Sequence, residues 1–509
     1  MPAFLEVSDA AGGLSPQQQR GREIYRRGTV AGASAGTAAI GADGMALPSS
    51  SFACANCHGI WGEGTREGGL EPPPLNWKRL TSPAVSTVTG RRRAPYSPET
   101  LQLAIAQGLD PAGMRLDAGM PRYDLPAERL AELVAYLERL GDADDTDPGV
   151  SSKSIRIGAA LPLSGPQAAA GMSIRDTLEL TFAAESRRGG IYGRSLDLVV
   201  EDSGGDPAGL LEATRRLVER DGVFALAASL EPGGGSDDSG RLLESLGTPL
   251  VGPVTLSPHQ KEPPNPYIFY LLPNLFDQAR ALVDFIAGRE SPRRPKLAVI
   301  QAGTALDRDV VDGLRQQASL QGLSVVAEEH DSPAAVAAVL SKRPDYLIFS
   351  GDGAGLARVA RQLDGGASPA LAAFVSTAQS GVGLLPETVA ARALLAAPAF
   401  PPDTHQAEGF FAVLAAGNSP HTYLGLRMAA FAAGSVLIQA VRSSGSRLSR
   451  EGLVNTLERL QHLETGITAP LTFRPGQRVG SAGAAILTFD PVSRTFVAAS
   501  GWLAPKDQF

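Results

Sequence analysis

The residues whose types and spacing most clearly indicate a chemical role are Cys54, Cys57 and His58. They form a Cys-x-x-Cys-His motif and include both cysteines of the chain. Two thiolates at this spacing can reach the two vinyl groups on one edge of a haem, and the next histidine then lies beneath the iron. A zinc site would require more Cys or His ligands nearby, whereas the next histidine is His259. A thioredoxin-like pair would require a preceding βαβ pattern, which residues 31–51 do not show. We therefore predict one covalently attached haem c.

A sixth ligand would complete the iron site. A methionine sulfur opposite His58 gives a low-spin haem with a raised potential, which suits electron transfer. Met120, in the sequence Gly-Met-Pro, is our candidate for this ligand, and Met114 is its rival. The alternative is that Met120 fills an irregular gap in the core, as methionine often does. We therefore predict His58 and Met120 as the two iron ligands.

Two helical patterns flank the motif. One contains Gly21 and Tyr25, and the other contains the apolar residues 133–137. A glycine allows two helix backbones to approach closely, and an aromatic ring fills the space at the crossing. With these features, residues 21–141 resemble the class I c-type cytochromes, which implies an all-α domain. The stretch 31–51, rich in Gly, Ala and Ser, is longer than the family's usual link to the attachment motif.

The same resemblance assigns further residues to the haem. The sequence Pro-Pro-Leu at 73–75 is similar to the loop in which a proline carbonyl accepts a hydrogen bond from Nδ1 of the proximal histidine. This would make Pro73 the partner of His58. The residues that the resemblance implies for cofactor binding are Cys54, Cys57, His58, Pro73, Leu75 and Met120.

The pattern of secondary structure expected from the sequence changes near residue 141, which divides the chain into two parts. The first part is helical and rich in loops, whereas beyond residue 154 short apolar runs alternate with helical patterns. This alternation predicts parallel sheets, and its length predicts two α/β lobes. The acidic stretch between the two parts has too little apolar content to pack and predicts a hydrated linker. The predicted parts are a disordered tail at 1–14, a monohaem domain at 15–141, the linker at 142–153 and a two-lobed domain at 154–509.

Several short motifs follow one another in a characteristic order after the linker. They are Ile-Arg-Ile-Gly at 155–158, Leu-Ser-Gly-Pro at 163–166, Gly-Gly-Ile-Tyr-Gly at 189–193 and Glu-Asp at 201–202. Their order resembles the N-terminal pattern of the type I periplasmic binding proteins, particularly the branched-chain amino-acid and amide-binding group. The resemblance implies two lobes joined by three crossing strands, with a ligand enclosed between them. No G-x-S-x-G or G-x-G-x-x-G motif in this region indicates an enzyme.

The resemblance places candidate ligand contacts at strand ends and helix beginnings, where backbone amides favour a carboxylate. Thr255 is the strongest candidate in the first lobe, with a helix cap as the alternative. In the second lobe, Asp352 could accept an ammonium group, with an exposed turn carboxylate as the alternative. The full set of candidates is Ser164, Ser229, Thr255, Leu306, Asp352 and Gln379.

Four positions depart from the pattern of relatives that bind leucine-like ligands. Ala170 and Leu306 stand where those proteins have aromatic side chains, and Pro232 and Gly233 stand where they have small hydroxyls. These departures favour a wider or more apolar cleft. It would suit an aromatic acid, an alcohol-derived metabolite or another protein better than an α-amino acid.

Charge and hydropathy restrict the partners and the location. The net charge of −7 disfavours nucleic acid, which requires a positive field. The longest apolar stretch, 424–441, is interrupted by Arg427, Ser435 and Gln439, which predicts a buried helix rather than a membrane span. No leader precedes Gly21, so we expect the export signal of this periplasmic protein to be absent from the chain.

Together these observations predict a periplasmic haem c protein that passes single electrons to or from a redox partner and is fused to a small-molecule-binding module. One alternative is a solute-binding receptor of an ABC-type transporter with an accessory cytochrome. Another is a redox or gas sensor with an open position at the iron. The predicted fold is multidomain: an all-α class I cytochrome c domain followed by a two-lobed α/β type I periplasmic-binding-protein fold.

Overall fold

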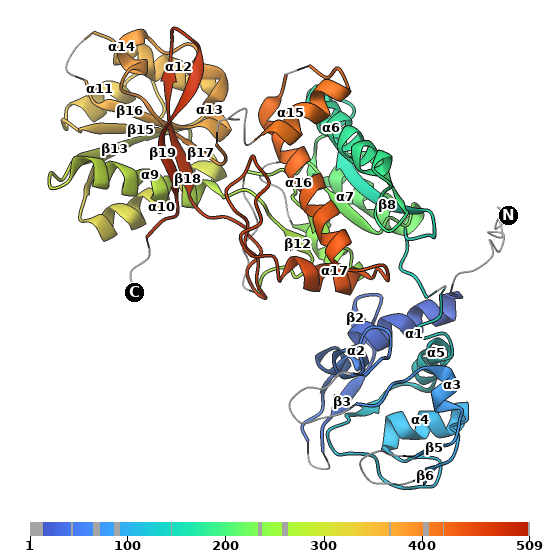
Figure 1. The fold of residues 1–509 in the computed structure, drawn as a ribbon. Helices are drawn as coiled ribbons and strands as arrows, with labels where there is room; N and C mark the ends of the chain where they lie inside the picture. Colours follow the sequence, from blue (N-terminus) through green and yellow to red (C-terminus); the bar gives the residue numbers. More distant parts are fainter. Residues whose placement is uncertain are drawn as a thin grey trace, which may run out of the picture. The chain divides into compact units, whose positions relative to one another are not determined.

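A computed structural model describes residues 14–41, 44–64, 72–85, 92–143, 145–232, 237–256, 263–365, 368–400, 407–420 and 422–506 of the chain. The chain divides into two compact units, which we describe separately (Figure 1). The N-terminal unit comprises Met1–Pro148, Glu244–Gly247 and Arg447–Gly452. The α/β unit comprises Gly149–Leu243, Thr248–Ser446 and Leu453–Phe509.

The helices of the N-terminal unit begin and end at sequence signals. The first helix, α1, begins at a capping box formed by Ser15 and Gln18, and it ends at Gly28, whose φ of 65° lies in the left-handed region that glycine adopts readily. Ser97 and Thr100 form the same kind of capping box for α4. The helices are α1 (Pro16–Arg27), α2 (Cys54–His58), α3 (Trp77–Leu80), α4 (Pro98–Gln107) and α5 (Ala127–Leu137).

The predicted crossing of two helices is present, because α1 packs against α5. Gly21 allows this approach: a Cβ atom at this position would lie 2.0 Å from the carbonyl oxygen of Glu132. The rings of Tyr25 and Tyr136 fill the crossing, with centroids 5.6 Å apart. Both tyrosines are fully buried, so this contact lies at the centre of the unit's hydrophobic core.

The N-terminal unit is not all-α, and this part of the predicted fold is wrong. The stretch 31–51 and the segment after Met120 form short strands, among them a sheet in the order β4-β3-β7, in which Thr37 pairs with Asp124. Sequence alone does not reveal this pairing because it joins segments far apart in the chain. The strands are β1 (Thr29–Val30), β2 (Ala33–Ser34), β3 (Thr37–Ala39), β4 (Leu47–Pro48), β5 (Ala84–Val85), β6 (Arg92–Arg93) and β7 (Arg122–Asp124), and a 3-10 helix covers Ser49–Phe52.

Two carboxylates of the acidic stretch after α5, those of Asp145 and Asp147, are buried. The guanidinium of Arg26 lies 2.8 Å from Oδ1 of Asp147, and the guanidinium of Arg22 lies 3.2 Å from the same atom. The hydroxyl of Tyr136 donates a hydrogen bond to Asp145 at 2.9 Å. Because these partners replace water around the carboxylates, the prediction of a hydrated linker is wrong for Asp145 and Asp147.

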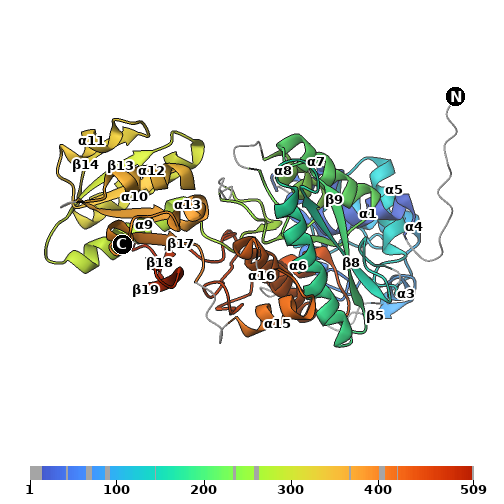
Figure 2. The same cartoon turned by 90° about the horizontal axis from the view of Figure 1, so that it is seen from above.

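The first lobe of the α/β unit is built on a parallel sheet in the order β12-β11-β10-β8-β9. Its strands are β8 (Ser154–Leu161), β9 (Ser195–Asp202), β10 (Ala225–Ala227), β11 (Leu250–Val251) and β12 (Ile268–Phe269). Its helices are α6 (Ala168–Arg187), α7 (Pro207–Arg215), the π-helical turn Arg216–Arg220, α8 (Asp238–Leu246), α15 (Glu408–Ala416), α16 (Leu424–Ser443) and α17 (Arg450–Leu457). Figure 2 shows α6 and α16 side by side, and these two helices pack against each other.

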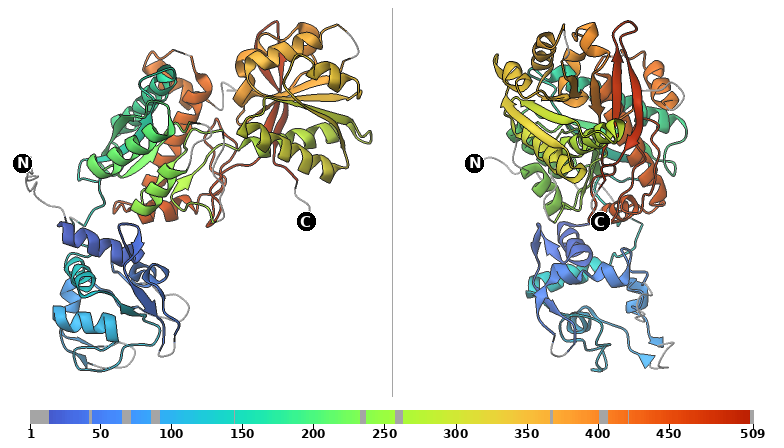
Figure 3. Two further views of the ribbon diagram at one scale, coloured as in Figure 1. Left: turned by 180° about the vertical axis from the view of Figure 1, so that it is seen from behind. Right: turned by 90° about the vertical axis from the view of Figure 1, so that its left-hand side faces the viewer.

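The second lobe contains a sheet in the order β14-β13-β15-β16-β17-β18-β19, with helices on both faces (Figure 3). The first five strands are parallel, and β18 and β19 are antiparallel to their neighbours. The strands are β13 (Lys296–Gln301), β14 (Ser324–His330), β15 (Tyr346–Ser350), β16 (Ala370–Phe374), β17 (Leu394–Ala397), β18 (Ala484–Asp490) and β19 (Thr495–Leu503). The helices are α9 (Leu275–Glu290), α10 (Ala305–Gln321), α11 (Ala335–Leu340), α12 (Gly353–Gln362), α13 (Val375–Val382) and α14 (Glu387–Ala390).

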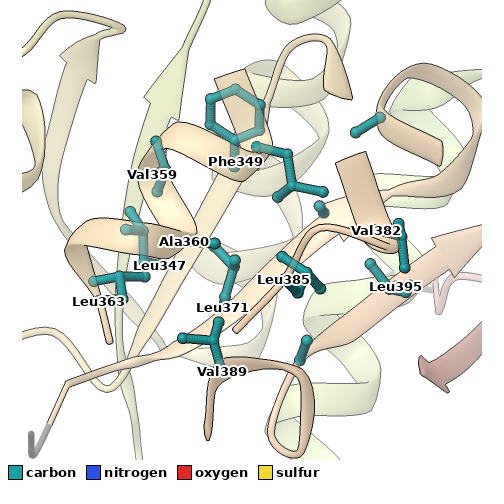
Figure 4. Close-up of a cluster of buried hydrophobic side chains, with 14 of the residues drawn as sticks. Leu347, Phe349, Val359, Ala360, Leu363, Leu371, Val382, Leu385, Val389 and Leu395 are labelled. Atoms are coloured by element: carbon teal, nitrogen blue, oxygen red, sulfur yellow. The ribbon is translucent and has the colours of Figure 1, made fainter. Parts of the chain in front are cut away.

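Two hydrophobic cores flank the sheet of the second lobe. Figure 4 shows the core under α12, α13 and α14, where Leu347 and Phe349 of β15 meet Val359 and Val389. The opposite core contains Ile348 of the same strand, because successive side chains of a strand point to opposite faces. The near-continuous apolar composition of β15 is typical of a strand that is covered on both sides.

The chain passes between the two lobes three times. It enters the second lobe after β12, returns to the first lobe after β17 and enters the second lobe again before β18. The predicted two-lobed α/β fold with three crossings is therefore present in the structure.

The helix α16 is the apolar stretch that the sequence analysis assigned to the interior. In the described part of the chain it is the one helix that is long and apolar enough to cross a membrane, as judged by length and composition. Its most apolar window is 67% buried. The buried guanidinium of Arg427 donates to Oγ1 of Thr177 on α6 at 3.1 Å. These contacts agree with a buried helix of the first lobe.

Candidate functional site

The candidate residues of the first lobe lie at one edge of its sheet. Because β8, β10 and β11 are parallel, their carboxyl-terminal ends meet at the same edge. Ser164 follows β8, Ser229 and Glu231 follow β10, and Thr255 follows β11. The structure therefore brings these candidates into one group of strand-end loops. Gly233, one of the departures from the family pattern, lies outside the described residues.

Ser229 points into the fold. It is fully buried, and its Oγ accepts a hydrogen bond from the backbone N–H of Ala160 at 3.1 Å. The preceding residue, Ala228, has a φ of 50°, a left-handed conformation that costs a non-glycine residue about 1 kcal/mol. The chain thus turns sharply as it leaves β10, and the Ser229 hydroxyl fastens this turn to β8.

We expect the substitution Ser229→Ala to lower the free energy of unfolding of the first lobe by about 1–2 kcal/mol. It leaves the buried N–H of Ala160 without its partner and removes no apolar packing. Denaturant unfolding followed by circular dichroism would measure the loss. Ser500→Ala is the comparison variant, because the Ser500 hydroxyl accepts a hydrogen bond from the Ile486 N–H at a site that is only partly buried. An unchanged midpoint for Ser229→Ala would contradict the structural role.

Glu231 is a functional candidate that the sequence analysis did not single out. Its carboxylate bonds to the Thr255 side chain, and its Oε2 atom is buried without a hydrogen-bond partner among the described residues. Burial and the nearby Asp237 carboxylate raise the pKa of Glu231 to about 7, and the Thr255 hydroxyl opposes this rise. Sequence gave little signal for this role, because the partners of Glu231 come from the loop after another strand.

The loop that carries Ser164 is held by Asp202 at the end of β9. One oxygen of Asp202 accepts hydrogen bonds from the backbone N–H groups of Leu163, at 2.8 Å, and Gly204, at 2.9 Å. These bonds, with one from the Ser164 side chain, lower the pKa of Asp202. Ser164 itself is exposed, as a residue available to a ligand must be.

The candidates of the second lobe also share one sheet edge. Leu306 follows β13, Asp352 follows β15, and Gln379 follows β16, and these three strands are parallel. Leu306 is half-buried against the core beneath α10. Gln379 is exposed on α13. Asp352 is exposed and caps α12, because its Oδ1 accepts from the Gly355 N–H at 2.8 Å.

The cysteine motif forms the short helix α2 of the N-terminal unit. The thiol of Cys54 lies 3.9 Å from the hydroxyl of Tyr123, and burial raises the pKa of this thiol to about 11. Nδ1 of His58 lies 3.0 Å from the carbonyl oxygen of Pro73. Burial lowers the pKa of His58, and the bond to Pro73 opposes that shift.

The remaining residues of the predicted haem site differ in exposure. Met120 is half-buried, whereas Met114 is exposed. The Met120 carbonyl accepts a hydrogen bond from the guanidinium of Arg122. Leu75 packs against the hydrophobic core of the N-terminal unit. Cys57 is exposed at the surface of α2.

Comparisons with known proteins cover the α/β unit. Residues 154–491 match the family model described as periplasmic binding protein. The Leu/Ile/Val-binding protein homolog 3 of Brucella melitensis biotype 1 is 24% identical over 241 residues, which are 46% of this chain and 63% of that protein. This chain thus spans less than two thirds of that relative's length.

Solved structures show the same fold. A branched-chain amino acid ABC transporter protein from Thermus thermophilus with bound valine is 18% identical, with a TM-score of 0.57 over 70% of this chain and 97% of that one. A fatty acid ABC transporter substrate-binding protein from Thermomonospora curvata is 18% identical, with a TM-score of 0.55 over 71% of this chain and 95% of that one.

The chain belongs to the periplasmic binding protein family, because the match to its model covers more than half of the sequence. Its two-lobed α/β fold is that of the solved structures to which it is similar. The family consists of ligand-binding proteins that are not enzymes, and it implies a location outside the cytoplasm. The sequence analysis predicted each of these properties.

The predicted haem c is contradicted by these findings. The family model is described as periplasmic binding protein, and a solved structure that the chain resembles was determined with bound valine. Among the residues that the structure describes, no group of three or more His, Cys, Asp or Glu side chains could hold a metal ion. Within the N-terminal fold, Cys54 contacts Tyr123 and His58 contacts Pro73. The predicted cytochrome domain, electron transfer and redox partner depend on the haem, and no finding supports them.

Proposed function

We propose that the protein is the solute-binding receptor of an ABC-type membrane transporter. Its family and its resemblance to binding proteins of such transporters support this proposal. The observation that carries it is the position of the candidate residues, all of which follow the carboxyl-terminal ends of parallel strands in two lobes. In open α/β sheets these ends are where ligands bind. The two lobes would close on the solute and present it to the transporter.

The ligand in this proposal is a small organic solute with an apolar body. The names of the similar proteins include a valine complex and a fatty-acid-binding protein, whose ligands share an apolar chain. The half-buried positions of Ala170 and Leu306 support an apolar wall, because neither side chain offers a polar group. Thr255 and Asp352 would supply polar contacts to the ends of the solute.

A calorimetric and thermal-shift screen of branched-chain amino acids, their amides and short fatty acids tests this proposal. A true ligand at 100 times its Kd stabilises the native state by about 2.7 kcal/mol and raises the melting temperature accordingly. We expect Thr255→Val to weaken binding of the ligand about tenfold, because it removes one polar contact.

The matched control for this variant is Thr495→Val, an exposed threonine at the start of β19, which should bind as the unmodified protein does. Cells that lack the chain should also lose uptake of the identified solute. If no compound in the screen shifts the melting temperature, the receptor proposal fails.

We also propose that residues 15–141 form a domain of their own, followed by the binding module from residue 154. The separate hydrophobic core around Tyr25, Tyr136 and Leu133 supports this division. Limited proteolysis should release a stable N-terminal fragment that includes Asp147, because Asp147 is paired with α1 of that unit.

A further inference from the structure

The backbone around Glu231 is held in place by hydrogen bonds to the strand β8 and to the segment that follows β11. The N–H of Leu230 donates to Ala160 at 3.1 Å, and the N–H of Glu231 donates to Val254 at 3.0 Å. In the other direction, the N–H of Val254 donates to the carbonyl of Ser229 at 2.8 Å. The loop after β10 is thus fastened to β8 itself and to the segment that follows β11. Its backbone cannot easily turn the Glu231 side chain away.

This side chain lacks one partner. The Thr255 side chain bonds to the carboxyl group, yet Oε2 is buried and accepts no hydrogen bond from the described residues. A buried polar atom without a partner costs about 1–3 kcal/mol, and such atoms are rare in native proteins. Among the described residues, the charged group that acts on Glu231 is Asp237, another carboxylate. The site therefore needs a proton donor that the described fold does not supply.

We propose that Glu231 is a ligand-binding residue and that Oε2 accepts a hydrogen bond from a protonated amino group of the solute. This inference rests on the proposed receptor function. It states which end of the solute lies at the sheet edge of the first lobe. A carboxylate placed at Oε2 would meet a second carboxylate and be repelled. The ammonium end of the solute therefore binds at the first lobe, beside Glu231 and Thr255.

The proposal predicts how affinity depends on pH. Because the pKa of Glu231 is about 7, the group is about one-tenth ionised at pH 6 and about nine-tenths ionised at pH 8. An ammonium ligand binds the ionised form more tightly, so its affinity should rise close to tenfold between these values. Asp237 is the other described titratable group that acts on Glu231.

The experiment uses the full chain and four probes that share an isobutyl group: L-leucine, L-leucinol, isoamylamine and 4-methylpentanoate. Isothermal titration at pH 6, 7 and 8 would give their Kd values. We expect the three amines to bind and 4-methylpentanoate to bind at least tenfold more weakly. The variant Glu231→Gln should weaken the amines at least tenfold at pH 8 and remove the pH dependence. The control Glu212→Gln, an exposed carboxylate on α7, should change neither.

The outcomes separate this inference from the receptor proposal. If 4-methylpentanoate binds as tightly as the amines, or if Glu231→Gln leaves amine affinity unchanged, the role of Glu231 is refuted while the receptor function stands. If no probe and no compound of the wider screen binds, the receptor function itself fails. Thermal unfolding without ligand checks the variant's fold: Glu231→Gln should melt at least as high as the unmodified protein at pH 8, because it removes a buried charge.

Discussion

Replacing Asp147 with alanine should destabilise the N-terminal unit by about 3–5 kcal/mol, the usual cost of breaking a buried ion pair. The side chain of Arg26 is only 2% exposed, and Asp147 is its nearest anion, at 2.8 Å. Without Asp147, a buried guanidinium keeps a charge that water cannot reach. Hydrogen exchange of peptides from α1 measures the effect, because α1 carries both Arg22 and Arg26.

The surface carboxylate Asp142 provides the control for this prediction. Its ion pair with Arg139 is 52% exposed on the Asp142 side, and pairs of this kind contribute about 0–1 kcal/mol. Asp142→Ala should therefore leave the exchange of α1 unchanged. Equal protection of α1 in the Asp147 and Asp142 variants would refute the role of the buried pair.

The ion pair of Asp147 with Arg26 makes the stability of the N-terminal unit depend on pH. Burial alone would raise the pKa of Asp147, but Arg26 and Arg22 hold it at about 2, below the ordinary value near 4. A lowered pKa contributes stability that is present above pH ~4 and is lost as the pH falls through 2. Protection of α1, corrected for the intrinsic rate, should fall in this range for the unmodified protein and less for Asp147→Asn.

The substitution Gly21→Ala should destabilise the N-terminal unit by about 3 kcal/mol. The new Cβ would lie 2.0 Å from the carbonyl oxygen of Glu132 and 2.8 Å from Cβ of Tyr136. Since one contact is with backbone, α1 and α5 must move apart, and the packing of Tyr25 against Tyr136 is lost with them. Urea unfolding followed by near-ultraviolet circular dichroism of the tyrosines measures this loss.

A matched variant separates the contact from helix propensity. Gly288 lies inside α9, and a Cβ there would meet no atom within 4 Å. Gly288→Ala should stabilise its helix by up to about 1 kcal/mol, because alanine is the better helix former. If Gly21→Ala is also stabilising, the close approach of α1 and α5 at Gly21 does not occur in solution.

Local patterns predicted the α/β unit, and the resemblance of two helical patterns to those of class I c-type cytochromes predicted the crossing of α1 and α5. Strands such as β15 are continuous apolar runs, and Gly21 and Tyr25 are one helical turn apart, so each signal lies within a few residues. The buried acidic stretch could not be predicted in this way. Asp147 is stabilised by Arg26, 121 residues earlier in the chain, and composition carries no record of that pairing.

The candidate site shows the same division. The resemblance to the type I periplasmic binding proteins implied contacts in strand-end loops, and Ser164, Thr255 and Asp352 lie there. The burial of Glu231 depends on how closely the segment after β11 approaches the segment after β10, which follows from tertiary hydrogen bonds. The prediction of a haem depended on the cysteine motif together with Met120 and Pro73, and the comparisons contradict it.

The third crossing between the lobes has a consequence for synthesis of the protein. The strand β17 ends at Ala397, and its antiparallel neighbour β18 begins only at Ala484. Translation adds about 5–20 residues per second, so the edge of β17 stays open for roughly 4–17 seconds after it emerges. During that time its unpaired backbone groups can pair with another chain. The nascent protein is thus most exposed to aggregation while the segment containing α15, α16 and α17 is being made.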